Sequence, residues 1–217
     1  MTSGPQSFPL QRSGALLKRF LAAIFVWLAL SILGYMYGGS LVKTLEPYYK
    51  SIIEMAHPEY VARIDYDDNK SEPAIELWVT AKKPISYAPG QTVAAGTTIG
   101  PTKVTIFHTM VPLIIFGVIV LVWPVKSLKE FALLLLFALP GALIVTGITS
   151  PFQMLGLLDT AFIGAAARHG VEYQSGAFDW MRFTEGGARW LIPIIVGILC
   201  GRLANKLGRG GEQVAQA

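Results

Sequence analysis

The chain has 217 residues, of which 53% are hydrophobic and only 15% are charged. This composition is typical of a membrane protein with several spans, and the length leaves no room for a second large soluble domain. The net charge of +4 could suggest a nucleic-acid partner, but the cations lie beside the apolar runs, so membrane topology explains them better and we expect no nucleic-acid binding.

Four runs of the chain are too apolar to face water. Each is close to the ~20 residues, at 1.5 Å rise per residue, that a helix needs to cross a hydrocarbon core of ~30 Å. We therefore predict a mainly α membrane protein with four transmembrane helices and short tails. The predicted spans are 20–38, 107–124, 131–149 and 189–206, and the tails are 1–19 and 207–217.

The first run has a basic flank, as a cleaved secretory signal would have. Its apolar stretch is longer than the roughly 7–15 residues of a signal core, and Tyr35, Tyr37 and the glycines that follow offer no clean Ala-x-Ala cleavage site. We therefore interpret it as an uncleaved anchor, and we expect the protein in the bacterial inner membrane.

Charge alternates by segment along the chain. The tail 1–19, the turn 125–130 and the chain from Arg202 onward carry more cations than anions, whereas the segments 39–106 and 150–188 carry more anions. Because cytoplasmic segments are enriched in Lys and Arg, both tails should be cytoplasmic and both long segments external. The predicted topology is multi-pass, with the N- and C-terminal ends inside.

The external segment 39–106 opens with a helical pattern. Apolar residues recur at helical spacing from Leu41 to Ala56, so this helix should continue from the first span, with Pro47 marking a kink or a restart. From Tyr60 the period of the pattern changes to two, which predicts strands.

The strand pattern indicates a small sheet outside the membrane. Residues 60–66 and 75–81 alternate around the polar turn 67–71, which predicts a β-hairpin. Weaker extended stretches follow at 92–99 and 103–107, so we expect a small antiparallel β segment between the first two spans. Such a sheet is too small to be stable alone and should pack on the helices or on a partner.

A further helix is predicted over 151–167. Ser150 has the position of an N-cap, Pro151 that of the first helical residue, and Gly170 that of a C-terminal stop. As a fifth span this helix would place Asp159 near the bilayer centre, at a cost of about 2.5–3.5 kcal/mol. We therefore expect an interfacial or re-entrant helix on the outer face, and the sequence leaves these two alternatives open.

No constellation of catalytic or metal-binding residues is evident. Cys200 falls in the cytoplasmic half of the fourth run, whereas His57, His108 and His169 all fall on the external side, so a Cys–His pair is excluded by the predicted topology. The histidines lack the spacing of a metal site, and the Asp67-Asp68-Asn69 cluster lacks the glycine and distal glutamate of a calcium loop. We expect no catalytic residue, no metal and no cofactor.

Aromatic and charged residues gather just before the fourth run. They fit an aromatic belt with cationic anchors, which flanks most spans, or a contact surface for another membrane protein, in which Trp and Arg are favoured. A histidine at the outer mouth of the second run completes the candidate partner-contact set. Its members are His108, Asp179, Trp180, Arg182, Arg189 and Trp190.

The layout resembles that of the small membrane proteins encoded beside exosortases, the exosortase-associated type. The resemblance covers the anchor span, the external β segment, the stretch 104–113 with Pro112-Leu113 at the entry to the second span, the tight turn 126–130, and the last two spans with the outer helix.

Exosortases are multi-span cysteine transpeptidases whose catalytic Cys, Arg and His act on the external face. Cys200 lies on the other side in the predicted topology, so the resemblance implies an accessory role and not the enzyme itself. We expect a non-enzymatic protein that assists the sorting or anchoring of exported proteins. Besides membrane lipids, its partner would be an exosortase-like transpeptidase or an exported protein. The alternative is a structural subunit of a membrane transporter or respiratory complex.

Overall fold

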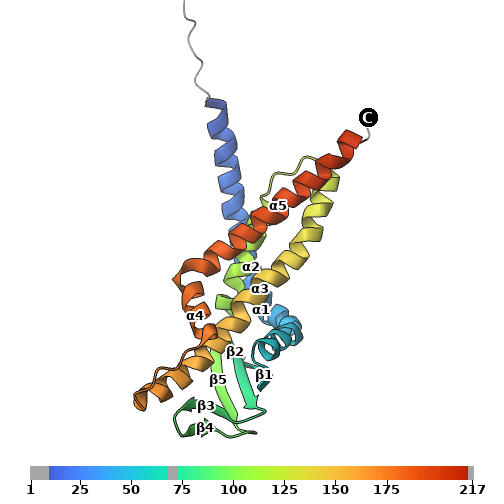
Figure 1. Ribbon diagram of the computed structural model, residues 1–217. Coiled ribbons are helices and arrows are strands. Elements are labelled where there is room, and N and C mark those ends of the chain that lie inside the picture. Colours follow the sequence, from blue (N-terminus) through green and yellow to red (C-terminus); the bar gives the residue numbers. More distant parts are fainter. Residues whose placement is uncertain (1–9, 68–72, 215–217) are drawn as a thin grey trace, which may run out of the picture.

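A computed structural model describes residues 10–67 and 73–214. These residues form a mainly helical protein with a small antiparallel sheet at one end (Figure 1). In chain order the elements are α1 (Leu10–Ala56), β1 (Tyr60–Asp67), β2 (Ala74–Ala81), β3 (Ile85–Ala88), β4 (Gln91–Val93), β5 (Thr98–Thr105), α2 (Ile106–Leu121), α3 (Leu128–Arg168), α4 (Gly176–Phe183), the π-helix η1 (Thr184–Ala188) and α5 (Arg189–Val214).

Three helical stretches are long and apolar enough to cross a membrane, which supports the prediction of a membrane protein. They are Leu16–Ala56, Leu128–Arg168 and Gly176–Arg209. The predicted second span forms α2, whose 16 residues are somewhat short for a full span. The four-span count therefore stays a prediction.

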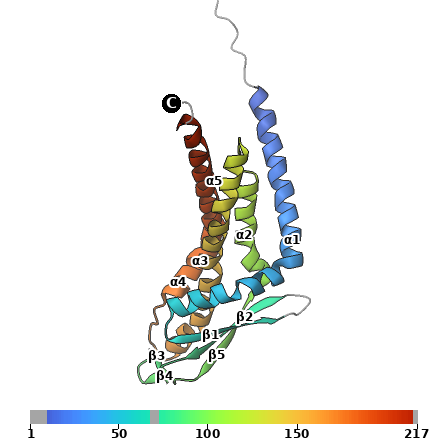
Figure 2. The same ribbon diagram turned by 90° about the vertical axis from the view of Figure 1, so that its right-hand side faces the viewer.

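Helix α1 has two halves with different surroundings. Its N-terminal part extends away from the sheet and meets α2 from about Leu30 onward, whereas its C-terminal half turns and lies across the sheet (Figure 2). Val42, Tyr49 and Ile53 in the second half are fully buried. The helix continues through Pro47, so the alternative of a restart at that residue is wrong. The helix 41–56 is otherwise found as predicted, in continuity with the first span.

The predicted hairpin is confirmed. β1 pairs with β2 in antiparallel register, from Tyr60 opposite Ala81 to Asp67 opposite Ala74, and β5 pairs with the other edge of β2. Most of the predicted turn, residues 68–71, lies outside the described residues.

The predicted strand 92–99 is wrong as a single element. The chain turns at Gly90 (φ 71°) and Gly96 (φ 82°), a conformation that favours glycine. β4 therefore ends at Val93 and pairs with β3, while β5 starts at Thr98 and ends at Thr105, where α2 begins.

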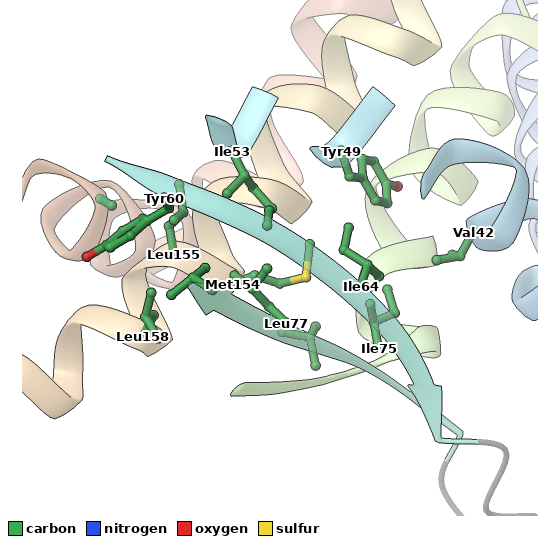
Figure 3. Packing of buried hydrophobic residues seen from close by; sticks show 14 of the residues in the cluster. Val42, Tyr49, Ile53, Tyr60, Ile64, Ile75, Leu77, Met154, Leu155 and Leu158 are labelled. Atoms are coloured by element: carbon green, nitrogen blue, oxygen red, sulfur yellow. The ribbon is translucent and has the colours of Figure 1, made fainter. Parts of the chain in front are cut away.

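One face of the three-stranded sheet is covered by two helices. Side chains from the C-terminal half of α1, from β1 and β2, and from α3 converge in a continuous core (Figure 3). Its fully or nearly fully buried members include Tyr49, Ile53, Tyr60, Ile64, Ile75, Leu77, Met154, Leu155 and Leu158. Burying one such aliphatic side chain stabilises the fold by roughly 1.5–3 kcal/mol. The helices thus stabilise the sheet, as expected for a sheet too small to be stable alone.

The break predicted at Ser150 is absent, because α3 runs without interruption through Pro151. The neighbouring Thr149 hydroxyl donates to the Val145 carbonyl oxygen (2.8 Å), a bond within a helix and not a cap. At 1.5 Å per residue the 41 residues of α3 extend about 60 Å, twice the thickness of a hydrocarbon core.

The apolar stripe of 151–167 is used inside the protein. Leu155, Leu158 and Phe162 are at most 4% exposed, and they pack into the core beneath the sheet. Residues 151–167 continue α3 and are not a separate helix, whereas the position of this stretch relative to the membrane stays a prediction. Tertiary packing outweighs the local start signal at Ser150. The predicted end is confirmed, since α3 stops at Arg168 and Gly170 has φ 70°.

A second, smaller core joins α2, α3 and α5 at the end far from the sheet. It contains Phe116, Val120, Leu134, Val145, Cys200 and Ala204. The turn before α3 is closed by Ser127, whose hydroxyl accepts the Glu130 N–H (3.1 Å), while the buried Glu130 carboxylate accepts the Lys126 N–H (2.7 Å). This reciprocal arrangement satisfies N–H groups that a helix start otherwise leaves unpaired.

Candidate partner-binding site

Four polar side chains meet where the sheet joins the helices, and we call them the polar junction. His108 comes from the first turn of α2, Gln153 from α3, Glu185 from η1 and Arg189 from the start of α5. Glu185 Oε1 lies 3.0 Å from His108 Nε2 and accepts from Gln153 Nε2 (3.0 Å), and Arg189 Nη1 contacts both ring nitrogens of His108. One carboxylate therefore links three other elements.

Local backbone features bring these residues together. The Thr105 hydroxyl caps α2 by accepting the His108 N–H (3.4 Å), which fixes the first turn of that helix. Between α4 and α5 the chain kinks at η1, where Gly187 has φ 127°, a value that no helix has and that favours glycine. This kink carries Glu185 into the junction, four residues before Arg189.

The junction is half-buried and its charges are balanced. The side chains of His108, Glu185 and Arg189 are 28%, 40% and 22% exposed. Arg189 also forms an ion pair with Glu185 (3.4 Å). Such a set can hold elements together and present hydrogen-bonding groups, but it contains no nucleophile. Among the described residues no group of three or more His, Cys, Asp or Glu side chains could hold a metal ion.

Helix α4 carries the middle of the predicted contact set. The Trp180 indole N–H donates to the Ile148 carbonyl oxygen of α3 (2.7 Å), and its ring lies 6.3 Å from that of Phe152. Trp180 therefore anchors α4 onto α3. Asp179 and Arg182 line a cavity on another side of the same helix.

The structure thus divides the predicted set. His108 and Arg189 lie in the polar junction, Trp180 packs against α3, and Asp179 and Arg182 line the cavity. Trp190 is 49% exposed on α5, with the Arg189 guanidinium 5.7 Å from the centre of its ring.

The sequence places Glu185 in the aromatic and charged stretch before the fourth run, but neither Glu185 nor Gln153 is in the predicted contact set. The i,i+4 spacing of Glu185 and Arg189 could have suggested their ion pair. No local pattern could have placed Gln153 beside them, because it comes from a different helix, 32 residues away from Glu185.

The cavity beside α4, which we call the α4 cavity, has a volume of about 660 Å³. Its wall is formed by the C-terminal end of α3, the segment 171–175 and α4. The side chains and backbone that line it belong to Ile163, Ala167, Val171, Glu172, Tyr173, Gln174, Ser175, Gly176, Phe178, Asp179 and Arg182.

A buried polar contact holds this wall in place. The Ser175 hydroxyl caps α4 by accepting the Phe178 N–H (3.0 Å), and it donates to the carboxylate of Asp159, which is 1% exposed. Burial raises the pKa of the neighbouring Tyr60 and Tyr173 hydroxyls, and the Asp159 carboxylate raises both further. Asp159 therefore lies in the interior of the protein, at the base of α4.

Comparison with known proteins gives no relative, since no family model, curated protein or solved structure matches the chain.

Proposed function

We propose that the protein is a non-enzymatic accessory protein of the bacterial inner membrane that assists an exosortase-type system for sorting or anchoring exported proteins. The observation that carries the proposal is the continuity of the core. The sheet, α1, α2 and α3 share one hydrophobic cluster, so the sheet end of the molecule is packed against the helices and not tethered by a linker. A partner bound at that end would be held at a fixed place next to the membrane.

A four-span topology with both ends inside underlies this proposal. Helix α1 begins and α5 ends at the same end of the molecule, and the sheet lies at the other end (Figures 1 and 2). α2 contacts α1, α3 and α5. Its 16 residues reach about 24 Å, which flanking residues would extend across the membrane. The sheet, the polar junction and the α4 cavity are then external.

The contact surface in this proposal runs from Trp190 past the polar junction to α4. Trp and Arg are the side chains that most often anchor protein interfaces. The partner is an integral membrane protein such as an exosortase-like transpeptidase, or an exported protein. We assign the chain no covalent step. Its thiol supports this, since Cys200 is buried and donates to the Phe137 carbonyl oxygen (3.4 Å).

Co-purification in mild detergent tests the proposal. A tagged protein should recover a transpeptidase or an exported substrate, and Trp190→Ala should reduce that recovery. Leu199→Ala is the matched control, because Leu199 is similarly exposed on the same helix (53% against 49%) but lies further along α5. Recovery of transporter or respiratory subunits would instead favour the structural-subunit alternative, and a protein that purifies alone would contradict both.

Reporter fusions test the topology separately. A fusion at Gly170, just past the end of α3, should report an external position. A cytoplasmic report at Gly170 would contradict the four-span arrangement and with it the external contact surface.

A further inference from the structure

We propose that the α4 cavity binds an extended peptide segment of an exported partner through one basic side chain of that segment. This inference rests on the proposed function for the identity of the partner. It goes further by naming the place of binding and the chemistry that the peptide must carry.

The cavity has the size and the position that such a ligand needs. Its volume of about 660 Å³ lies within the roughly 300–1,000 Å³ typical of ligand pockets. It lies at the end of α3 that packs on the sheet, the external end in the proposed topology. A polypeptide that has crossed the membrane can therefore reach it.

The charges of the wall favour a cation. Glu172 and Asp179 both line the cavity, and within the described part of the chain neither forms an ion pair. The cation in the wall, Arg182, lies over the Phe178 ring, 5.8 Å from its centre. Two acidic residues thus line one cavity without an ion-pair partner among the described residues, and a ligand's ammonium or guanidinium group would supply one.

The backbone of the wall favours a peptide over a small amine. In the described residues, Val171 N–H donates to the Ala166 carbonyl oxygen (3.1 Å), but residues 172–174 form no main-chain hydrogen bond. Their N–H and C=O groups are therefore available to pair with an extended chain, as in other modes of strand-like peptide recognition.

The segment is also held in place before any ligand arrives. Tyr173 stacks on Phe162 of α3, with ring centres 5.9 Å apart, and Ser175 is bonded to the buried Asp159 carboxylate. Anchoring at both places lowers the entropy that binding would otherwise cost. The α4 cavity is therefore a preorganised site.

The test uses purified full-length protein in detergent and two fluorescent peptides. One is a capped Gly–Ser peptide with a single central arginine, and the other carries citrulline, which has nearly the same shape and no charge. The arginine peptide should bind more tightly. Glu172→Gln and Asp179→Asn should each weaken its binding about two- to fivefold, as expected for one partly exposed ion pair.

Arg182→Gln gives the sharpest result, because it should tighten binding of the arginine peptide by a similar factor. It removes a like charge from the wall and frees the Phe178 ring. General damage to the fold would only weaken binding. Asp65→Asn, which changes a carboxylate paired with Arg63 on β1, is the control and should have no effect. Thermal unfolding of each variant verifies that it is folded.

Equal binding of the two peptides, or weaker binding to Arg182→Gln, would overturn the inference. So would acetyl-arginine amide binding as tightly as the whole peptide, since the backbone would then contribute nothing. The assay needs no cellular partner. If the partner is recovered but the peptide does not bind, the proposed peptide site in the cavity is wrong and the sorting role stands. If the peptide binds in a charge-dependent way but no partner is recovered, the sorting role is wrong and the peptide site stands.

Discussion

The two ends of the molecule use apolar side chains in opposite ways. At the sheet end, large side chains such as Tyr49, Ile75 and Leu77 are fully buried. In the helical bundle, large apolar side chains face outward, and Phe25 is 74% exposed and Leu139 71% exposed. Water drives the first arrangement through the hydrophobic effect, whereas lipid is as apolar as the side chains and gives helices no such reason to associate.

The bundle helices instead meet at glycines. A Cβ atom at Gly197 would lie 2.7 Å from the Ile119 side chain, and one at Gly141 would lie 2.9 Å from both Phe116 and Cys200. Small residues let membrane helices approach closely enough for van der Waals contact to hold them. The sheet end is therefore stabilised mainly by burial of apolar side chains, whereas the bundle is stabilised mainly by the close approach of its helices.

Two leucines of α3 offer the largest test of this comparison. Leu155→Ala empties a fully buried site beneath the sheet, and we expect it to lower the free energy of unfolding by about 2–5 kcal/mol. Leu139→Ala makes the same chemical change at a site that is 71% exposed, in the half of the helix assigned to the membrane. It should change the free energy of unfolding by less than about 0.5 kcal/mol.

Chemical unfolding in detergent micelles, followed by circular dichroism, measures both leucine variants. Similar losses at Leu139 and Leu155 would mean that a partner or a second copy covers the bundle. The contrast between lipid-facing and core-facing leucines would then be wrong.

Two glycines of the same helix test close approach at the sheet end. A Cβ atom at Gly156 would lie 2.5 Å from Met181 Cβ and 2.8 Å from the Ala177 carbonyl oxygen, both of α4. Gly156→Ala should therefore push α4 away from α3 and cost about 1–3 kcal/mol. At Gly164 a Cβ meets nothing within 4 Å, so Gly164→Ala should stabilise the helix by up to about 1 kcal/mol.

Unfolding of the two glycine variants under one set of conditions gives the sign of each change. Loss of stability in Gly164→Ala would show that the end of α3 is not free to accept a side chain. Equal effects at the two positions would mean that close contact with α3 does not hold α4 in place.

The sequence predicted the elements of this fold better than their continuity. The hairpin could be predicted from local patterns, because the alternation in Tyr60–Asp67 and Ala74–Ala81 depends only on one face of the sheet being buried. The break at Ser150 failed because a start signal of about 1 kcal/mol competes with several buried side chains worth more. The bond from the Trp180 indole N–H to the Ile148 carbonyl oxygen could not be predicted from a local pattern, since the two residues are 32 positions apart.

The polar junction is the place where the two ends meet, and Glu185 is its central acceptor. Glu185→Gln keeps the shape but leaves Arg189 without its ionic partner, which should cost about 1 kcal/mol because the pair is partly exposed. Glu172→Gln is the matched control, because Glu172 is an exposed carboxylate with no ion pair in the described residues, and it should cost under about 0.5 kcal/mol. Equal stability of the two variants would mean that the junction does not join the two ends.

The smallest effect concerns a buried hydroxyl at the sheet end. Burial raises the pKa of Tyr60 from its ordinary value of 10.0, and the nearby Asp159 carboxylate adds to that shift. Below about pH 10 both the folded and the unfolded chain keep the proton, so Tyr60 does not make stability depend on pH there. Above it only the unfolded chain loses the proton, and stability falls by about 1.4 kcal/mol per pH unit for this group until the folded pKa is reached.

Tyr60→Phe removes that contribution. The difference in unfolding free energy between the variant and the wild type should therefore shift in favour of the variant by about 1 kcal/mol between pH 9 and pH 11. If the difference in unfolding free energy stays constant over that range, water reaches the Tyr60 hydroxyl. The core beneath the sheet would then be accessible to solvent at this residue.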